Sequence, residues 1–216
     1  GVSLLAHVGI DVWGADLNRV DVVRDVSSEV LTSLCRIRPS YPAVRPWVDL
    51  GPRTDVVSSG TCEAVAAAVV QTALDHGALP AIISADNALQ DGVTTGEAIV
   101  AAAASVSRWP GAGKVRTLLA MMDGRSQSVG ESRLRVMLTI AGLGLVPQFP
   151  VCDEGADVPF AYADLLVDGT NLLLEFDGKV KYGSQEALWR EKRREDRIRR
   201  RNYRVERVIW ADLERP

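Results

Sequence analysis

The stretch AYADLLVDGTNLLLEFDGK, residues 161–179, determines how the second half of this chain folds. Two apolar runs, 161–167 and 171–177, are separated by Asp168-Gly169-Thr170. An Asp-Gly pair readily supplies the positive φ angles that a tight turn between antiparallel strands needs. These residues therefore predict a β-hairpin.

The segments on both sides extend this hairpin into an α/β domain. Before it, a helix is expected over 128–141, where Gly142 would end it, and a short strand over 146–151. After it, a charged helix is expected over 185–201 and a last strand over 204–210. The predicted order is helix, three strands, helix, strand.

The first part of the chain has a different character. The β-branched run 20–26 predicts a strand, and mixed α/β structure is expected up to residue 60. Apolar runs after residue 60 then predict a small helical bundle, with helices over 61–76, 80–89, 94–107 and 113–122. The polar, turn-rich stretch 123–128 separates the two parts, so we expect one domain over 1–124 and another over 125–216.

Composition restricts the class of protein. The chain is 47% hydrophobic and 25% charged, which suits domains with apolar cores and a charged surface. Its longest apolar runs, 64–70 and 99–104, fall far short of the ~20 residues that cross a bilayer, so we expect a cytoplasmic protein with no membrane contact. The two histidines, His7 and His76, lie far from the second domain, so any metal there should be held by oxygen atoms.

The net charge of −3 conceals a strong asymmetry. Residues 184–210 contain 10 basic and 5 acidic side chains, whereas residues 1–183 contain 14 basic and 21 acidic ones. Basic side chains on one helical face can neutralise several phosphates, although a solvated helix with ion pairs four residues apart has the same composition. Leu188, Trp189 and Ile198 are predicted to pack on the sheet. The candidate nucleic-acid-binding residues are Arg190, Arg193, Arg194, Arg197, Arg200 and Lys181.

Charged residues gather at the end of the predicted hairpin. Glu175, Asp177 and Lys179 are two residues apart and would share one face of a strand, and Asp164 lies on the neighbouring strand. Charges beside an apolar run must be paired or bind a metal. Cross-strand ion pairs are the simpler interpretation. The sharper one is a Mg²⁺ or Mn²⁺ site held by Asp164, Asp177 and Glu175, with Lys179 beside the attacking water.

These residues resemble the motifs of the PD-(D/E)xK nuclease superfamily, and more closely those of Vsr-like endonuclease domains. The resemblance covers roughly residues 126–216. It implies a restriction-endonuclease-like αβββαβ core, with helices flanking a mixed central sheet, and Mg²⁺-dependent cleavage of nucleic acid. The motifs are Gly130-Glu131-Ser132-Arg133-Leu134-Arg135, Ala163-Asp164-Leu165, residues 175–183, residues 190–196 and Trp210-Ala211-Asp212-Leu213.

Glu131 has two interpretations. Ser128 and Glu131 have the spacing of a capping box, in which both side chains bind amides at a helix N-terminus. In the resembling family the corresponding glutamate points into the active site, which implies contact with metal or water.

The upstream part resembles, more weakly, the C-terminal domain of AbiEi-type antitoxins. Residues 2–7, Trp13-Gly14 and residues 81–92 carry this similarity. In such proteins a winged-helix DNA-binding domain usually comes first, so we expect a shortened relative without that domain. A toxin partner is a further expectation.

Two functions from different classes follow. The leading hypothesis is a Mg²⁺-dependent endonuclease that hydrolyses DNA phosphodiester bonds in phage defence, a toxin-antitoxin system or repair. A single site cuts one strand, so double-strand cleavage would need a homodimer or sequential nicking. The alternative is an antitoxin-like or regulatory protein that binds DNA or a partner without cleavage. This alternative rests on the upstream resemblance to antitoxins and on two departures from the Vsr-like pattern: Ala163 stands where that pattern has proline, and no histidine lies near the site.

Overall fold

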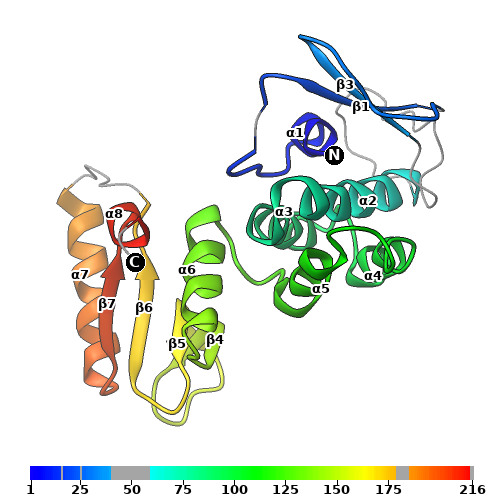
Figure 1. Ribbon diagram of the computed structural model, residues 1–216. Helices are drawn as coiled ribbons and strands as arrows, with labels where there is room; N and C mark the ends of the chain where they lie inside the picture. Colours follow the sequence, from blue (N-terminus) through cyan, green and yellow to red (C-terminus); the bar gives the residue numbers. More distant parts are fainter. Residues whose placement is uncertain (16, 25, 40–58, 179–184, 215–216) are drawn as a thin grey trace. The chain divides into compact units, whose positions relative to one another are not determined.

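The computed structural model describes residues 1–15, 17–24, 26–39, 59–178 and 185–214. It is a mixed α/β structure with two compact units, Gly1–Val129 and Gly130–Pro216 (Figure 1). Within the described ranges, none of the helices has the length and apolar character needed to cross a membrane.

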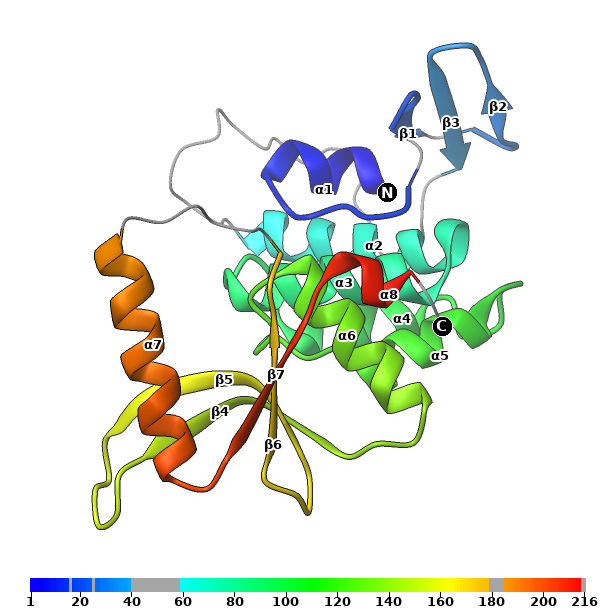
Figure 2. The same cartoon turned by 90° about the vertical axis from the view of Figure 1, so that its left-hand side faces the viewer.

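The first unit combines a small sheet with a group of helices. Helix α1 (Val2–Val8) precedes strands β1 (Val20–Arg24), β2 (Val30–Leu31) and β3 (Cys35–Pro39). The sheet order is β1-β3-β2, in which β3 is parallel to β1 and antiparallel to β2 (Figure 2). The sequence predicted β1, but α1, β2 and β3 were not predicted.

The predicted helices of this unit are confirmed. They are α2 (Ser59–His76), α3 (Ala78–Gln90), α4 (Gly96–Ala104) and α5 (Ala112–Met121). Helix α2 contacts α1 and the other three, and its apolar residues 64–70 are all buried. A helix that is apolar on all sides is expected to be surrounded by other elements, and α2 is the central helix of this unit.

The second unit has the predicted order of elements. Its strands form one sheet in the order β4-β5-β6-β7, antiparallel except for the parallel pair β6 and β7. The elements are α6 (Val129–Ile140), β4 (Leu145–Cys152), β5 (Pro159–Val167), β6 (Leu172–Phe176), α7 (Gln185–Arg200), β7 (Arg204–Val208) and α8 (Trp210–Leu213).

The turn between β5 and β6 is the predicted one. Gly169 has φ 71°, and the Thr170 amide donates to the carbonyl of Val167 at 3.2 Å. The last strand ends earlier than predicted. Trp210 begins α8 instead of ending β7, and Asp212 Oδ2 accepts from the amide of Ile209 at 2.9 Å.

The two long helices cover opposite faces of this sheet (Figure 1). Leu134 of α6 packs with Leu165 and Leu174, whereas Ile198 of α7 packs with Leu173 and Ala163. Each face thus has its own apolar core. Burial of Ile198 confirms one prediction for α7, but the prediction that Leu188 and Trp189 also pack on the sheet is wrong, because they are 62% and 56% exposed.

Strands β4 and β5 are interrupted opposite each other. Pro147 pairs with Leu165 and Phe149 with Ala163, but the intervening Gln148 and Asp164 do not pair, and Gln148 has φ 50°. Residues two apart normally share a face of a strand. Here Ala163 packs on the α7 side and Leu165 on the α6 side, so β5 changes faces at Asp164.

Candidate active site

Asp164 lies at this interruption and leaves the regular ladder of β5. The described pairs of β5 with β6 are Leu165 with Leu174 and Leu166 with Leu173. Beyond these pairs, the amide of Phe176 donates to the side chain of Asp164 and not to a backbone carbonyl of β5, with Asp164 Oδ2 accepting at 2.7 Å. The side chain is therefore held in place at the end of the β5–β6 pairing.

The pKa of Asp164 is raised to about 6. Burial is the largest cause, and the charge of Glu131 adds to it, followed by that of Glu175. The Phe176 amide and Arg194 act in the opposite direction without cancelling the rise. A carboxyl close to other carboxylates in a partly desolvated place is stabilised as an anion by a bound cation.

Glu175, the next predicted ligand, is on β6 and is held by an arginine of α7. Its side chain is only 13% exposed, and Oε1 accepts from Arg194 Nη2 at 2.7 Å. The same guanidinium donates to the carbonyl of Tyr162 at 2.9 Å and to Glu191 at 3.3 Å. Arg194 was predicted to contact nucleic acid, but in this structure its donors are turned inward to the site.

Glu131, on α6, reaches the same place from the opposite face. Its Oε2 accepts from Gln148 Nε2 at 3.2 Å. Gln148 was not among the predicted site residues. One signal was available, because a polar residue between Pro147 and Pro150 in an apolar edge strand is typical of a bulge, where pairing stops and a side chain is redirected.

The remaining predicted residues are less central. Asp177 follows β6, is exposed, and donates its amide to the carbonyl of Val208 at 2.9 Å. Lys179 and Lys181 lie outside the described residues. Glu131 and Glu175 thus lie near enough to Asp164 to raise its pKa, but the carboxylate oxygens of the three do not all lie within 4.8 Å of one another, and Asp177 lies just past the strand end.

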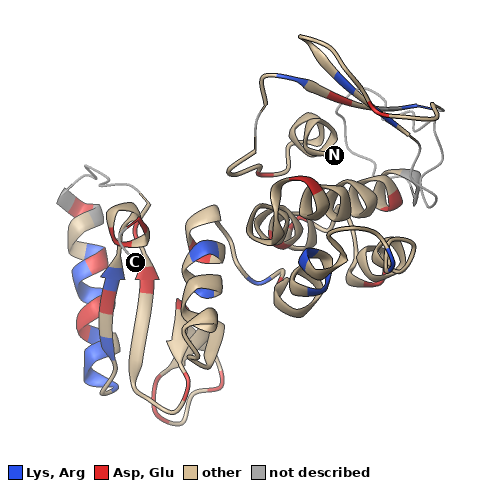
Figure 3. Ribbon diagram, viewed as in Figure 1, with Lys and Arg blue, Asp and Glu red and all other residues tan. Residues whose placement is uncertain are grey.

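The predicted basic residues lie along α7, where lysine and arginine gather with β7 (Figure 3). Arg190, Arg193 and Arg200 are exposed and form no ion pair with any residue that the structure describes. Arg197 is bonded to Asp153, and its guanidinium lies 4.0 Å from the ring centroid of Phe160. The outer side of α7 therefore has an excess of positive charge.

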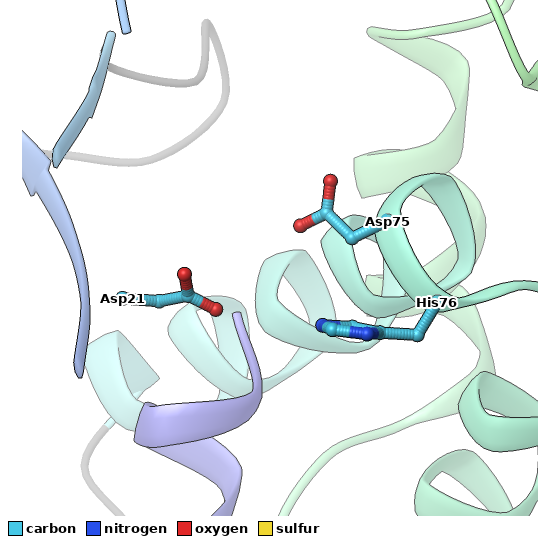
Figure 4. A group of neighbouring side chains, drawn as sticks. All are labelled: Asp21, Asp75 and His76. Atoms are coloured by element: carbon cyan, nitrogen blue, oxygen red, sulfur yellow. The ribbon is translucent and has the colours of Figure 1, made fainter. Parts of the chain in front are cut away.

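Among the described residues, the group of three metal-binding residue types with closely spaced ligand atoms lies in the first unit. Asp21 of β1 and Asp75 and His76 of α2 have ligand atoms within 4.8 Å of one another (Figure 4). His76 Nε2 is buried without a hydrogen-bond partner among the described residues. Asp75, however, is already bonded to Arg38 and accepts from Gln71 at 3.0 Å. A cation here would have to displace the guanidinium of Arg38, so we interpret the group as an ion-pair network that joins the sheet to α2.

The second unit offers oxygen donors in this region. Glu131 of α6, Asp164 of β5 and Glu175 of β6 lie around the point where β4 and β5 stop pairing. Hard cations such as Mg²⁺ bind this type of donor. In comparisons with protein-family models, with curated proteins and with solved structures, no match to this chain was found.

Proposed function

We propose that the second unit is a Mg²⁺-dependent nuclease domain with a restriction-endonuclease-like core, which hydrolyses phosphodiester bonds in DNA. One observation carries the proposal: burial and two neighbouring carboxylates raise the pKa of Asp164 to about 6. Such a carboxyl either takes up a proton or is stabilised as an anion by a cation. In this proposal, a cation bound at Asp164 is the one that the site uses to hydrolyse a polyanion such as DNA.

The residue types suit Mg²⁺, because Asp164, Glu175 and Glu131 are half-buried carboxylates and none of the three is a histidine or a cysteine. Their oxygens would have to move closer together to share one ion. When bound, the ion would polarise the scissile phosphate and lower the pKa of a bound water. Asp177, just past the end of β6, can complete the ligand set.

The protein's own residues have distinct roles in this proposal. The Phe176 amide donates to Asp164, Arg194 and Arg207 pair with Glu175, and Gln148 donates to Glu131, so each carboxylate is oriented by the protein. Orientation before binding reduces the entropy that the reaction must overcome. Lys179, which the sequence places two residues after Asp177, would orient the attacking water.

The test is nicking of supercoiled plasmid in Mg²⁺, with EDTA as the reference. We expect the parent protein to nick, Asp164→Asn to lose at least about 100-fold of the activity, and Asp157→Asn, an exposed loop aspartate, to keep it. The proposal fails if the parent does not nick, or if Asp164→Asn nicks as fast as the parent.

A second candidate is a protein that binds DNA or a partner without cleaving. The ion pair of Glu175 with Arg194 favours it, because that pair satisfies one presumed ligand without any metal. Calorimetry with Mn²⁺ separates the two functions. A binding isotherm that Asp164→Asn abolishes supports the nuclease, and the absence of any isotherm supports the second candidate.

A further inference from the structure

We propose that the outer side of α7 binds a single-stranded nucleic acid, with a phosphate in an arginine-lined hollow and a base stacked on Trp189. This inference rests on the proposed function and specifies the form of its substrate. It depends on three features of α7: the hollow, the unpaired arginines and the exposed indole.

The hollow is a depression of about 370 Å³ between α7 and the end of β4. This volume is equivalent to roughly a dozen waters, enough for a phosphate with part of its hydration. Four arginines and two aspartates give it an excess of two positive charges. The lining residues are Asp153, Arg193, Asp196, Arg197, Arg200 and Arg201.

The arginines of the hollow are of two kinds. Arg197 is fixed by Asp153 and by the ring of Phe160, and Arg201 pairs with Glu154 at 3.4 Å. Arg193 and Arg200 are exposed and unpaired among the described residues. The first pair shapes the wall of the hollow, and the second pair is available for a phosphate.

Trp189 lies on the same side of the helix. Positions 189, 193, 196 and 200 follow at intervals of three or four residues and so share one face, which extends over ~16 Å at 1.5 Å per residue. The indole is 56% exposed, and Lys192 Nζ lies 5.8 Å from its ring centroid. A large exposed aromatic surface beside cations is the combination with which proteins hold unpaired bases.

Base stacking distinguishes a single strand from a duplex. A duplex offers its phosphates to arginines, but its bases are already stacked on each other and cannot lie flat on Trp189. A single strand offers phosphates to the arginines and unstacked bases to Trp189. Arg193 is followed in the chain by Arg194, which is bonded to Glu175, so α7 carries both the proposed strand-binding side and a side chain of the candidate site.

The experiment measures binding without cleavage, by fluorescence anisotropy of labelled 12-nucleotide DNA in EDTA, single-stranded and duplex. We expect the single strand to bind at least about fivefold more tightly than the duplex. Trp189→Ala should weaken single-strand binding about tenfold and remove the preference. Arg193→Gln with Arg200→Gln should weaken both and lower the slope of log K against log salt by ~1.4 for the single strand.

Two controls match these variants. Arg199→Gln removes a charge from another side of α7, where Arg199 pairs with Glu195 at 2.5 Å, and Trp109→Ala removes a 41% exposed indole from the first unit. Both should bind as the parent does. Quenching of tryptophan fluorescence by the single strand, lost in Trp189→Phe, tests stacking without truncating the side chain.

Equal affinity for single strand and duplex overturns the inference, as does a Trp189→Ala variant that binds like the parent. Failure of the proposed function looks different, because nicking in Mg²⁺ would be absent while binding in EDTA persisted. Circular dichroism of each variant shows whether the fold is retained.

Discussion

Replacing Asp164 by asparagine should stabilise the second unit at neutral pH in the absence of metal. An aspartate has an ordinary pKa of 3.8, whereas that of Asp164 is about 6 in the folded protein. The folded state therefore holds a proton more tightly than the unfolded state, and the free energy of unfolding falls as pH rises from about 4 to 6. Asparagine does not ionise, so the variant does not lose this stability as the pH rises. Its side-chain carbonyl oxygen can still accept from the Phe176 amide.

The size of the effect follows from the shift. A change from 3.8 to about 6, at 1.36 kcal/mol for each pKa unit, corresponds to an upper value of about 3 kcal/mol at pH 7. For a unit of this size, 1 kcal/mol moves the unfolding temperature by roughly 4–8 °C, so the expected gain is on the order of 10 °C. The gain should vanish at pH 3.5, below the ordinary pKa.

Differential scanning calorimetry in EDTA at pH 3.5 and pH 7 measures this, with Asp157→Asn as the exposed control. Addition of 10 mM Mg²⁺ should then raise the unfolding temperature of the parent but not of Asp164→Asn, because only the parent retains the full set of carboxylates. An Asp164→Asn variant that is less stable than the parent in EDTA at pH 7 would refute the reasoning, since it would mean that the charged carboxylate is favourable in this position.

Three further predictions concern the same unit. Glu131→Gln should lower the pKa of Asp164 toward its ordinary value, as followed by ¹³C NMR of the carboxyl, because Glu131 is the largest charge effect on it. Ile198→Ala should destabilise the unit by about 2–5 kcal/mol in urea unfolding, whereas Leu188→Ala should change its stability by less than about 0.5 kcal/mol, since only Ile198 is buried. Gly130→Ala should destabilise it by at least ~2 kcal/mol in the same assay, because the added Cβ would lie 1.9 Å from the ring of Phe176.

Much of the second unit could be predicted because its signals are local. Asp168-Gly169 fixes the hairpin, and its register, continued one step beyond the pair Leu165 and Leu174, makes Asp164 and Glu175 neighbours. Short elements without a distinct pattern were not predicted. Strand β2 has two residues, and α8 begins where an apolar strand would continue.

Gln148 could not be assigned from alternation, because its position depends on a break in alternation. A residue with φ 50° interrupts β4, and the matching interruption in β5 places Asp164 between the two faces of the sheet. Both interruptions depend on how β4 and β5 pair with each other. The residue pattern within one strand does not reveal that pairing.

The wrong prediction for α7 has a physical cause that bears on function. Apolar residues were expected to mark the inner side of the helix, as they do when a helix covers an apolar sheet. The inner side instead contains Glu191 and Arg194 beside Ile198, because the sheet beneath presents the charged residues Glu175 and Arg207. The hydrophobic pattern is misleading here because the helix covers a charged site.

This network also separates the two interpretations of the carboxylates. Ion pairs from α7 and β7 engage both oxygens of Glu175, which face Arg194 and Arg207, so a cation bound to this residue would have to displace an arginine. These ion pairs do not account for Asp164. Burial and the charges of Glu131 and Glu175 raise its pKa more than the Phe176 amide and Arg194 lower it, so its pKa is about 6. A structural ion-pair cluster would be expected to lower the pKa of each carboxylate. Asp164 is thus the carboxyl of this cluster that the described ion pairs do not explain.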